Sequence, residues 1–287
     1  MDWRHADSQA SQPDPMRARY GVARPAVETI ALTRRFGTLT AVDAIDLSIR
    51  AGEIFGLLGA NGAGKTTLIK MLTTLLPPTS GTARVVGFDI VTAPADVRRH
   101  IGYVPQMVSA DGALTGYENL RLSAKLCGVP AAQREARIAE SLDFAGLAGS
   151  AAKLVRAYSG GMVRRLELAQ AMLHRPPVLF LDEPTIGLDP VARHSVWDQL
   201  RGLERDLGTT VLFTTHDMEE AESLCDRLAI LHAGRVAVAG KPSELRAELG
   251  PGATMDDVFA RHAGGGARDG GGFAGTVEAR RTARRLG

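Results

Sequence analysis

The sequence lacks any long apolar run. It has 287 residues, of which 45% are hydrophobic and 23% are charged, the proportions of an ordinary globular protein. Uninterrupted apolar segments such as residues 55–58 and 178–181 are far shorter than the ~18 residues that suggest a membrane-spanning helix. We therefore expect a chain that does not cross a bilayer by itself, with enough length for one large α/β domain or two small ones.

Cysteine and net charge are also scarce. The two cysteines, Cys127 and Cys225, are far apart and lack metal-ligand spacing. The first residues, MDWRHAD, lack the apolar core of a secretory signal. These absences predict a reducing, cytoplasmic setting. The formal net charge is only +2, because 34 Lys and Arg oppose 32 Asp and Glu.

The excess positive charge lies at the two ends. Residues 1–25 have four arginines against three aspartates, and residues 261–287 have six arginines against Asp269 and Glu278. Neither segment has enough apolar surface to order itself. We expect residues 1–25 to be a flexible lead, starting at Met1 or Met16, and residues 250–287 to be a Gly/Arg-rich extension, mostly disordered after residue 260. A basic tail could touch nucleic acid or anionic lipid, but a solvated tail is the simpler interpretation.

Short apolar or β-branched segments alternate with longer helical patterns between these ends. Such alternation is typical of a largely parallel sheet with crossover helices. Strands are expected at residues 28–33, 45–49, 54–58, 83–86, 101–104, 178–181 and 211–214, then a hairpin of residues 227–231 and 235–239. Residues 114–158 have no strand pattern, and helices are expected at residues 118–126, at residues 133–145 and after Met162. The sequence therefore predicts an α/β core interrupted by an all-helical insert.

A phosphate-binding loop follows the predicted strand at residues 54–58. Residues 59–66 read Gly-Ala-Asn-Gly-Ala-Gly-Lys-Thr and match the pattern Gly-x-x-x-x-Gly-Lys-Ser/Thr, with a helical pattern over residues 67–76 after it. Glycines let backbone N–H groups turn inward around phosphate oxygens, and the helix N-terminus adds its positive dipole end. Lys65 is expected to neutralise the β and γ phosphates, and the Thr66 hydroxyl to hold Mg²⁺. The predicted nucleotide-binding residues of this segment are Gly59, Asn61, Gly62, Gly64, Lys65, Thr66 and Thr67.

Two observations narrow the class of nucleotide-binding protein. GTPases of the common kind read guanine with Asn-Lys-x-Asp, but the only asparagines, Asn61 and Asn119, are followed by glycine and leucine. The apolar segment 178–181 ends in Asp182 and Glu183, and burial of a strand does not explain two carboxylates. In a phosphate-loop ATPase the first would hold Mg²⁺ through water and the second would polarise the attacking water. The sequence thus favours an ATPase, with a helicase-type motor still open.

Five further short motifs follow one another along the chain. They are Phe36 in TRRFG, Gln106 at the end of IGYVPQ, YSGGM at residues 158–162, GLD at residues 187–189, and His216. Together with the phosphate loop and the two carboxylates, they resemble the nucleotide-binding subunits of ABC transporters over about residues 27–249. Each motif alone has a simpler structural explanation, such as a core Phe or a salt-linked histidine, but their order and spacing favour function.

The resemblance implies a role for each motif. Adenine would stack on Phe36, Gln106 would sense the γ-phosphate and the membrane partner, and His216 would be the switch histidine. Ser159, Gly160 and Gly161 would face the γ-phosphate of a nucleotide held by another subunit, because a hydroxyl and glycines before a helix make an anion site. Asp189, a good helix N-cap before Pro190, would also communicate across that dimer.

The resemblance also implies a fold and a division into domains. The fold is α/β, with a phosphate-loop (RecA-like) ATPase core, an antiparallel β subdomain and an inserted all-helical subdomain at about residues 107–175. The ATP-binding domain would span residues 26–249. Glu183, His216 and Gln106 would be catalytic, and Thr66, Gln106 and Asp182 would bind Mg²⁺. Because the chain has one phosphate loop and one signature, a second ATP-binding subunit, expected to be another copy, would complete each ATP site.

The signature departs from the common Leu-Ser-Gly-Gly-Gln form at Tyr158 and Met162. Methionine cannot replace the hydrogen bonds of a glutamine amide. YSGGM, with LTGYENL at residues 114–120 and MDDVF at residues 255–259, looks most like the ATPases of bacterial drug exporters of the daunorubicin-resistance type.

The expected function is therefore ATP-driven export of drugs or other hydrophobic compounds through a separate integral-membrane permease, at the cytoplasmic face of the membrane. No nucleic acid partner is expected. The alternative is a soluble ABC-type ATPase with a regulatory or nucleic-acid-related role. Such proteins usually have long coiled-coil insertions or two fused ATPase cassettes, and this sequence shows neither.

Overall fold

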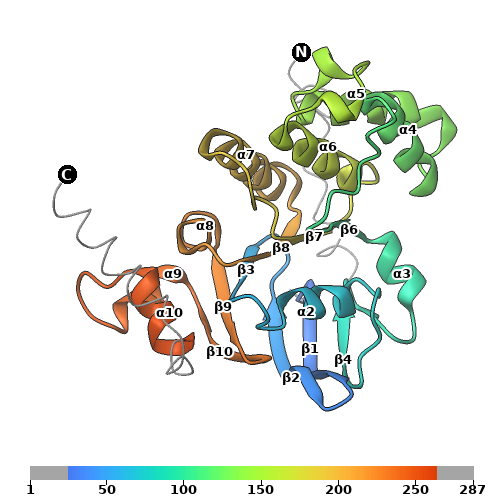
Figure 1. Ribbon diagram of the computed structural model, residues 1–287. Coiled ribbons are helices and arrows are strands. Elements are labelled where there is room, and N and C mark those ends of the chain that lie inside the picture. Colours follow the sequence, from blue (N-terminus) through green and yellow to red (C-terminus); the bar gives the residue numbers. More distant parts are fainter. Residues whose placement is uncertain (1–24, 264–287) are drawn as a thin grey trace.

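The computed structural model describes residues 25–263. The predicted N-terminal lead, apart from its last residue, and the Gly/Arg-rich part of the tail beyond residue 263 lie outside this range. Two β-sheets and a separate group of helices make up the described chain (Figure 1). The predicted α/β fold, with an antiparallel β subdomain and an inserted helical subdomain, is confirmed.

Four strands form an antiparallel sheet in the order β2-β1-β4-β5. Their bounds are Val27–Phe36 (β1), Leu39–Ile49 (β2), Ser80–Val85 (β4) and Phe88–Asp89 (β5). The first two strands are longer than the sequence pattern predicted. A tight turn at Gly37, with φ of 57°, carries their pairing as far as Phe36 and Leu39, and so brings Phe36 to the tip of a hairpin.

Six strands form the second sheet in the order β10-β9-β3-β8-β7-β6. Their bounds are Ile54–Leu58 (β3), Ile101–Val104 (β6), Val178–Asp182 (β7), Thr210–Thr215 (β8), Arg227–His232 (β9) and Arg235–Gly240 (β10). The first five in chain order pair in parallel, and β10 joins β9 as the predicted hairpin. Its turn residues Ala233 and Gly234 both have positive φ, as a type I′ turn requires.

Helices cover both faces of the six-stranded sheet. Helix α2 (Lys65–Leu72) lies against the antiparallel sheet as well, and its side chains Leu68 and Ile69 are buried in the core that the two sheets share. Helix α7 (Pro190–Leu207) packs on the opposite face. The sequence pattern extended the first of these helices to residue 76, which is wrong. Thr74 has φ of 62°, and a left-handed residue ends an α-helix.

The helical insert has a core of its own. It contains α4 (Gly116–Leu126), α5 (Arg134–Phe144) and α6 (Gly160–Met172), which pack around buried Leu120, Ile138 and Leu166. Short 3₁₀ helices connect them at Ala131–Gln133, Ala148–Ser150 and Val155–Ala157. Figure 1 shows this group on the side of the molecule away from the antiparallel sheet. The predicted helices at residues 118–126 and 133–145 are confirmed, with shifts of one or two residues at their ends.

The remaining described helices are α3 (Pro94–Arg99), α8 (Met218–Leu224), α9 (Pro242–Ala247) and α10 (Met255–Ala263). The last of these buries Met255, Val258 and Phe259 in a cluster with residues of β9 and α8. The first part of the predicted C-terminal extension thus packs on the α/β core, and the domain boundary at residue 249 stays a prediction. Between residues 25 and 263, no helix has both the length and the apolar character that a bilayer span demands.

Candidate active site

Three neighbouring parallel strands bring the predicted motifs to one edge of the sheet. Strands β3, β8 and β7 lie side by side, and each is buried along its whole length. The phosphate loop follows β3, His216 follows β8, and Asp182 ends β7. Because the carboxyl ends of parallel strands meet at one edge, ligands bind there in open α/β sheets.

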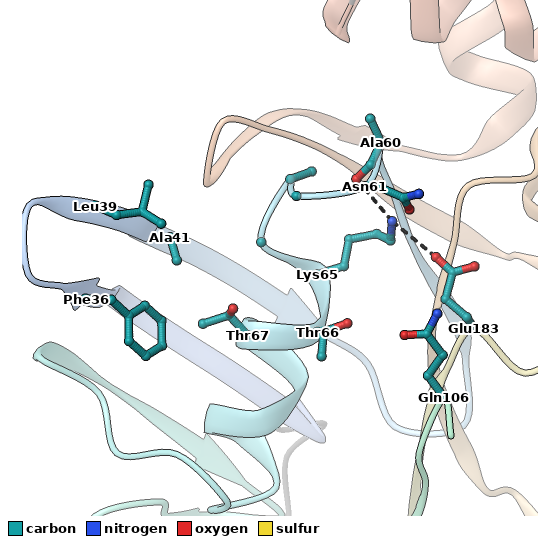
Figure 2. A pocket seen from close by; sticks show the side chains of 13 residues that line it. Phe36, Leu39, Ala41, Ala60, Asn61, Lys65, Thr66, Thr67, Gln106 and Glu183 are labelled. Atoms are coloured by element: carbon teal, nitrogen blue, oxygen red, sulfur yellow. Dashed lines mark hydrogen bonds and ion pairs between the residues drawn. The ribbon is translucent and has the colours of Figure 1, made fainter. Parts of the chain in front are cut away.

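A cavity of about 490 Å³ opens at this edge (Figure 2). Its lining comes from the tip of the β1–β2 hairpin, the phosphate loop, and the ends of β6 and β7. The lining residues are Phe36, Leu39, Ala41, Ala60, Asn61, Gly62, Ala63, Gly64, Lys65, Thr66, Thr67, Gln106 and Glu183. Nine predicted site residues are among them, so the structure brings most of the predicted nucleotide-binding residues together.

The phosphate loop needs its glycines for conformation and for close packing. Gly62 and Gly64 have φ of 82° and 104°, values that L side chains adopt only under strain. A Cβ on Gly64 would also lie 2.4 Å from the Ala41 carbonyl oxygen, and one on Gly59 would lie 2.8 Å from the Leu231 carbonyl oxygen. The loop is therefore held close to β2 and β9, and α2 starts directly from it.

Lys65 is almost fully buried at the start of α2, with 5% of its surface exposed. Its Nζ donates hydrogen bonds to the carbonyl oxygens of Gly59, at 2.6 Å, and Ala60, at 3.3 Å. The same ammonium lies 3.2 Å from Glu183 Oε1, an ion pair visible in Figure 2. The lysine is thus fixed between the loop and the end of β7.

Asp182 accepts hydrogen bonds from two hydroxyls. Thr66 Oγ1 lies 3.1 Å from Asp182 Oδ1, and Thr214 Oγ1 lies 2.7 Å from the same oxygen. A hydroxyl and a carboxylate beside the phosphate loop are hard oxygen donors of the kind that Mg²⁺ prefers. Two of the three predicted metal-binding residues, Thr66 and Asp182, therefore meet in space. Among residues 25–263, no group of three or more His, Cys, Asp or Glu side chains is arranged so that it could hold a metal ion.

Glu183 turns sharply out of the strand. Its φ is 51°, a left-handed conformation that costs a non-glycine residue about 1–2 kcal/mol. Its carboxylate lies between Lys65 Nζ and His216 Nδ1, which is 2.7 Å from Glu183 Oε2. Since a carboxylate only accepts, Nδ1 is the donor and Nε2 is left to face outward. The side chain of His216 is 49% exposed.

Phe36 and Gln106 border the cavity. Phe36 is 45% exposed, which rules out a core position, and the Arg34 guanidinium lies 4.6 Å from its ring centroid. Gln106 is exposed directly after β6. Figure 2 shows its side chain beside Glu183. We call Phe36, residues 59–67, Gln106, Asp182, Glu183 and His216 the phosphate-loop group.

The other predicted residues lie elsewhere and form a second set, which we call the signature group: Ser159, Gly160, Gly161 and Asp189. Ser159 is the N-cap of α6 and accepts from the Met162 N–H at 3.3 Å. Asp189 is the N-cap of α7 and accepts from the Ala192 N–H at 2.9 Å. None of the four lines the cavity described above. A Cβ on Gly161 would lie 2.7 Å from Ala192 Cβ, so the two helix N-termini touch.

The two departures from the common signature have a packing explanation. Tyr158 is buried, and its hydroxyl donates to the Ser150 carbonyl oxygen at 2.8 Å. Met162 packs, partly buried, against the core of the helical insert. These side chains belong to the insert, while Ser159 keeps its capping role.

A buried pair on α6 was missed by the sequence reasoning. Arg164 donates to the carbonyl oxygens of Pro105, at 2.9 Å, and Gln106, at 3.2 Å. Its guanidinium lies 3.1 Å from Glu167 Oε2, and Glu167 Oε1 accepts from both the N–H and the hydroxyl of Ser109. Burial lowers the pKa of Arg164, and Glu167 opposes that shift. The pair fastens the loop around Gln106 to the helix that begins at the signature.

Two contacts of α8 connect the phosphate-loop group to α7. Asp217, next to His216, forms a 2.9 Å ion pair with Arg193. Glu220 is fully buried and accepts from the Thr185 hydroxyl at 2.7 Å and from the Trp197 indole N–H at 3.0 Å. Burial raises the pKa of Glu220, although these hydrogen bonds act in the other direction.

Fold and site together define a phosphate-loop ATPase that presents a second anion-binding motif on a helical insert. The sequence profile of the family described as ABC transporter matches residues 42–186. A profile described as AAA domain, putative AbiEii toxin, Type IV TA system, matches residues 151–222. The chain belongs to the ATP-binding proteins of the ABC transporter family.

Individual relatives agree with this assignment. The daunorubicin/doxorubicin resistance ATP-binding protein DrrA of Streptomyces peucetius is 48% identical over 225 residues, which are 78% of this chain and 68% of that protein. The Nod factor export ATP-binding protein I of Ralstonia nicotianae is 45% identical over 221 residues, 77% of this chain and 68% of that protein.

Solved structures show the same architecture. The ATP-binding subunit of an ABC transporter superposes with a TM-score of 0.74 at 30% identity, over 82% of this chain and 98% of that one. A dimeric ATP-binding cassette bound to ADP and Pi gives a TM-score of 0.68 at 27% identity, over 75% of this chain and 98% of that one. The chain is thus an ATP-binding and ATP-hydrolysing subunit of a family that dimerises and acts with membrane permease subunits.

Proposed function

We propose that this chain hydrolyses ATP, with Mg²⁺, to drive export of drugs or other hydrophobic compounds through a separate membrane permease. The main support for ATP hydrolysis by this chain is the contact of Glu183 with both Lys65 and His216 at the edge of the phosphate-loop cavity. The export part rests on relatives named for daunorubicin/doxorubicin resistance and for Nod factor export.

The phosphate-loop group has the chemistry that hydrolysis needs. The N–H groups of the loop and the start of α2 bind phosphate oxygens, Lys65 neutralises their charge, and the ring of Phe36 supports adenine. Thr66, Asp182 and Gln106 would hold Mg²⁺, which would supply charge neutralisation when bound. Glu183 takes the proton of the attacking water, and His216 orients the Glu183 carboxylate through its Nδ1–H.

The signature group acts in a second copy. Ser159, Gly160 and Gly161 make a hydroxyl and backbone N–H groups at a helix N-terminus, where a negative charge is stabilised. They do not line the cavity of their own chain, and Asp189 lies beside them. Two chains facing head to tail would place each signature group on the nucleotide of the other chain.

The permease contacts the surface around Gln106. The two residues that follow, Met107 and Val108, are 82% and 64% exposed. Adjacent apolar side chains on an exposed loop favour contact with another protein. Their backbone is fastened to α6 through the neighbouring Pro105, Gln106 and Ser109. Attachment there would hold the chain at the cytoplasmic face of the membrane.

Glu183→Gln tests the catalytic assignment. A glutamine keeps the shape of the side chain and accepts the His216 bond, but it cannot take a proton from water. We expect turnover to fall by about 10²–10⁴-fold, while ATP is still bound and ATP-dependent dimers accumulate, as measured by phosphate release and size-exclusion chromatography. Glu219→Gln removes an exposed carboxylate of α8 and is the matched control. Unchanged hydrolysis by Glu183→Gln would refute the assignment.

Co-expression with a polytopic membrane protein, taken from the neighbouring reading frame where that frame encodes one, tests the export assignment. We expect the two chains to co-purify from membranes and to lower drug accumulation in cells, and Glu183→Gln to abolish the second effect. A chain that stays out of the membrane fraction and co-purifies with nucleic acid would support the regulatory alternative.

A further inference from the structure

Thr214 is a buried polar residue that no motif includes. It lies at the edge of the sheet where the site forms, directly opposite Asp182 in the pairing of β7 with β8. Its side chain has no exposed surface. Its hydroxyl donates to Asp182 Oδ1 at 2.7 Å and accepts from the Glu183 N–H at 2.9 Å. A single hydroxyl therefore touches two neighbouring residues that are expected to do different chemistry.

The direction of each hydrogen bond is fixed by the partners. An ionised carboxylate only accepts and a backbone N–H only donates, so the Thr214 proton must point to Asp182 and its lone pair to Glu183. Thr66 donates to the same Asp182 oxygen, at 3.1 Å. The Thr66 hydroxyl lines the cavity and is the one expected to turn to a ligand. Thr214 is fully buried, so its hydroxyl does not face the cavity as Thr66 does.

The second hydrogen bond holds an unfavourable backbone conformation. Successive residues of a strand point to opposite faces, so an extended Glu183 would point to the face opposite the Asp182 side chain. The left-handed turn at Glu183, with φ of 51°, brings its carboxylate to Lys65 and His216 instead. Such strain persists only where surrounding contacts hold it, and the Thr214 hydroxyl is one of them.

We propose that Thr214 is a positioning residue for ATP hydrolysis, whose hydroxyl sets the orientation of the Asp182 carboxylate and the turn that aims Glu183. It touches neither the nucleotide nor the attacking water. The inference rests on the proposed roles of Asp182 and Glu183, and it predicts a loss of turnover with little loss of nucleotide binding.

Thr214→Val is the direct test, because valine keeps the shape and removes the hydroxyl. We expect kcat to fall by about 10–100-fold, the usual effect of removing a group that orients a functional side chain, with the KM for ATP within about twofold. Thr214→Ser keeps the hydroxyl and is expected to restore most of the rate. Should the valine variant fail to fold, Thr214→Cys, with a weaker donor of similar size, is expected to give an intermediate rate.

Thr210→Val is the matched control. Thr210 lies at the other end of β8, is 1% exposed, and its hydroxyl accepts from the Gly52 N–H at 2.9 Å. Its loss should lower the melting temperature about as much as Thr214→Val does, with kcat unchanged. Equal rates for the two valine variants would overturn the inference.

ATP-dependent dimerisation, which can be measured in the absence of hydrolysis, separates a positioning role of Thr214 from a merely structural one. If Thr214→Val slows only hydrolysis, ATP-bound dimers should accumulate with it as they do with Glu183→Gln, whereas a loosened site would bind ATP poorly and form none. Absence of such dimers would contradict the inference. A wild-type chain that hydrolyses and a Glu183→Gln variant that does not, together with a fully active Thr214→Val, would reject this inference and leave the proposed function intact.

Discussion

The phosphate-loop group and the signature group differ in how their polar side chains are bonded. In the first, hydrogen bonds and ion pairs join different elements: Lys65 of α2 contacts Glu183, Thr66 contacts Asp182, and His216 contacts Glu183. In the second, Ser159 and Asp189 each accept from a backbone N–H three residues further along. One group is a network preorganised within a single chain, and the other is a pair of helix caps.

On the proposed function, this difference explains why a single chain would not form a complete ATP site. The network already holds Lys65 and Thr66 beside the phosphate loop, so the phosphate-loop group should bind nucleotide by itself. The signature group has anion-binding geometry but no anion-binding cavity in its own chain. The contacts of Arg164 with the Gln106 loop and of Glu220 with Thr185 and Trp197 join the elements that carry the two groups.

Lys65→Ala should give the largest effect, because it removes the cation of the preorganised network. We expect ATP affinity of the monomer to fall by about 100-fold, in line with ~1.5–3 kcal/mol for a charged hydrogen bond, and turnover to disappear. Isothermal titration at a chain concentration too low for dimers measures the affinity. Lys70→Ala, on the exposed side of the same helix, should bind ATP normally. Normal ATP binding by Lys65→Ala would contradict the network.

Ser159→Ala should separate the two groups most clearly. We expect unchanged ATP affinity of the monomer but about tenfold weaker ATP-dependent dimerisation in the Glu183→Gln background, measured by analytical ultracentrifugation, because the anion site loses its hydroxyl. Removing an N-cap costs about 1 kcal/mol of stability by itself. Thr115→Ala removes the cap of α4 at a similar cost and is the control. Equal dimerisation by the two variants would leave the signature group without its proposed role.

The sequence predicts those site residues that belong to local patterns, and it does not predict those that depend on contacts between distant elements. The phosphate loop and the Asp182–Glu183 pair are local patterns, and the order of strands and helices around them predicts the α/β core. His216 is singled out only by its place in an order of motifs that resembles the ABC transporter family. Thr214 could not be found in this way, because its contact with Asp182 depends on the register between β7 and β8. Arg164 could not be found either, because its role depends on the loop at Gln106 folding onto it. In the sequence it is only one basic residue of a predicted helix.

Packing also decides features that local patterns predict wrongly. A helical pattern through residue 76 does not show that the chain turns at Thr74 to enter the antiparallel sheet. The signature and Asp189 lie side by side because Gly161 of α6 closely contacts Ala192 of α7. In YSGGM, Gly161 packs on α7 and Met162 packs in the helical insert. The sequence alone does not predict that these two adjacent residues pack against different elements.

Arg164→Lys should loosen the link between the two groups. Lysine keeps the charge but lacks the planar fork that reaches both Pro105 and Gln106, so one of these part-buried carbonyl bonds is lost. We expect a loss of about 1 kcal/mol in the free energy of unfolding, measured with urea, and lower cooperativity between ATP binding and dimerisation. Arg165→Lys, on the next residue of α6, is the control. A loss as large with Arg165→Lys would show that any arginine of this helix has the same effect.

Glu220→Gln should give the smallest and most specific effect, a change in pH dependence. Burial raises the pKa of Glu220 above its ordinary value of 4.5, so the folded chain keeps a proton that the unfolded chain has already lost. The wild type therefore loses stability as pH rises from about 4.5 through the raised pKa of Glu220.

The amide oxygen of glutamine can still accept from Thr185 and Trp197, but it does not ionise. Thermal unfolding between pH 4.5 and 8 should show the wild type losing stability relative to Glu220→Gln as pH rises. Glu219→Gln, which changes an exposed neighbour of the same helix, controls for the loss of a charge. A constant difference between the wild type and Glu220→Gln across this range would mean that the carboxyl joining α8 to α7 is ionised in the folded chain throughout.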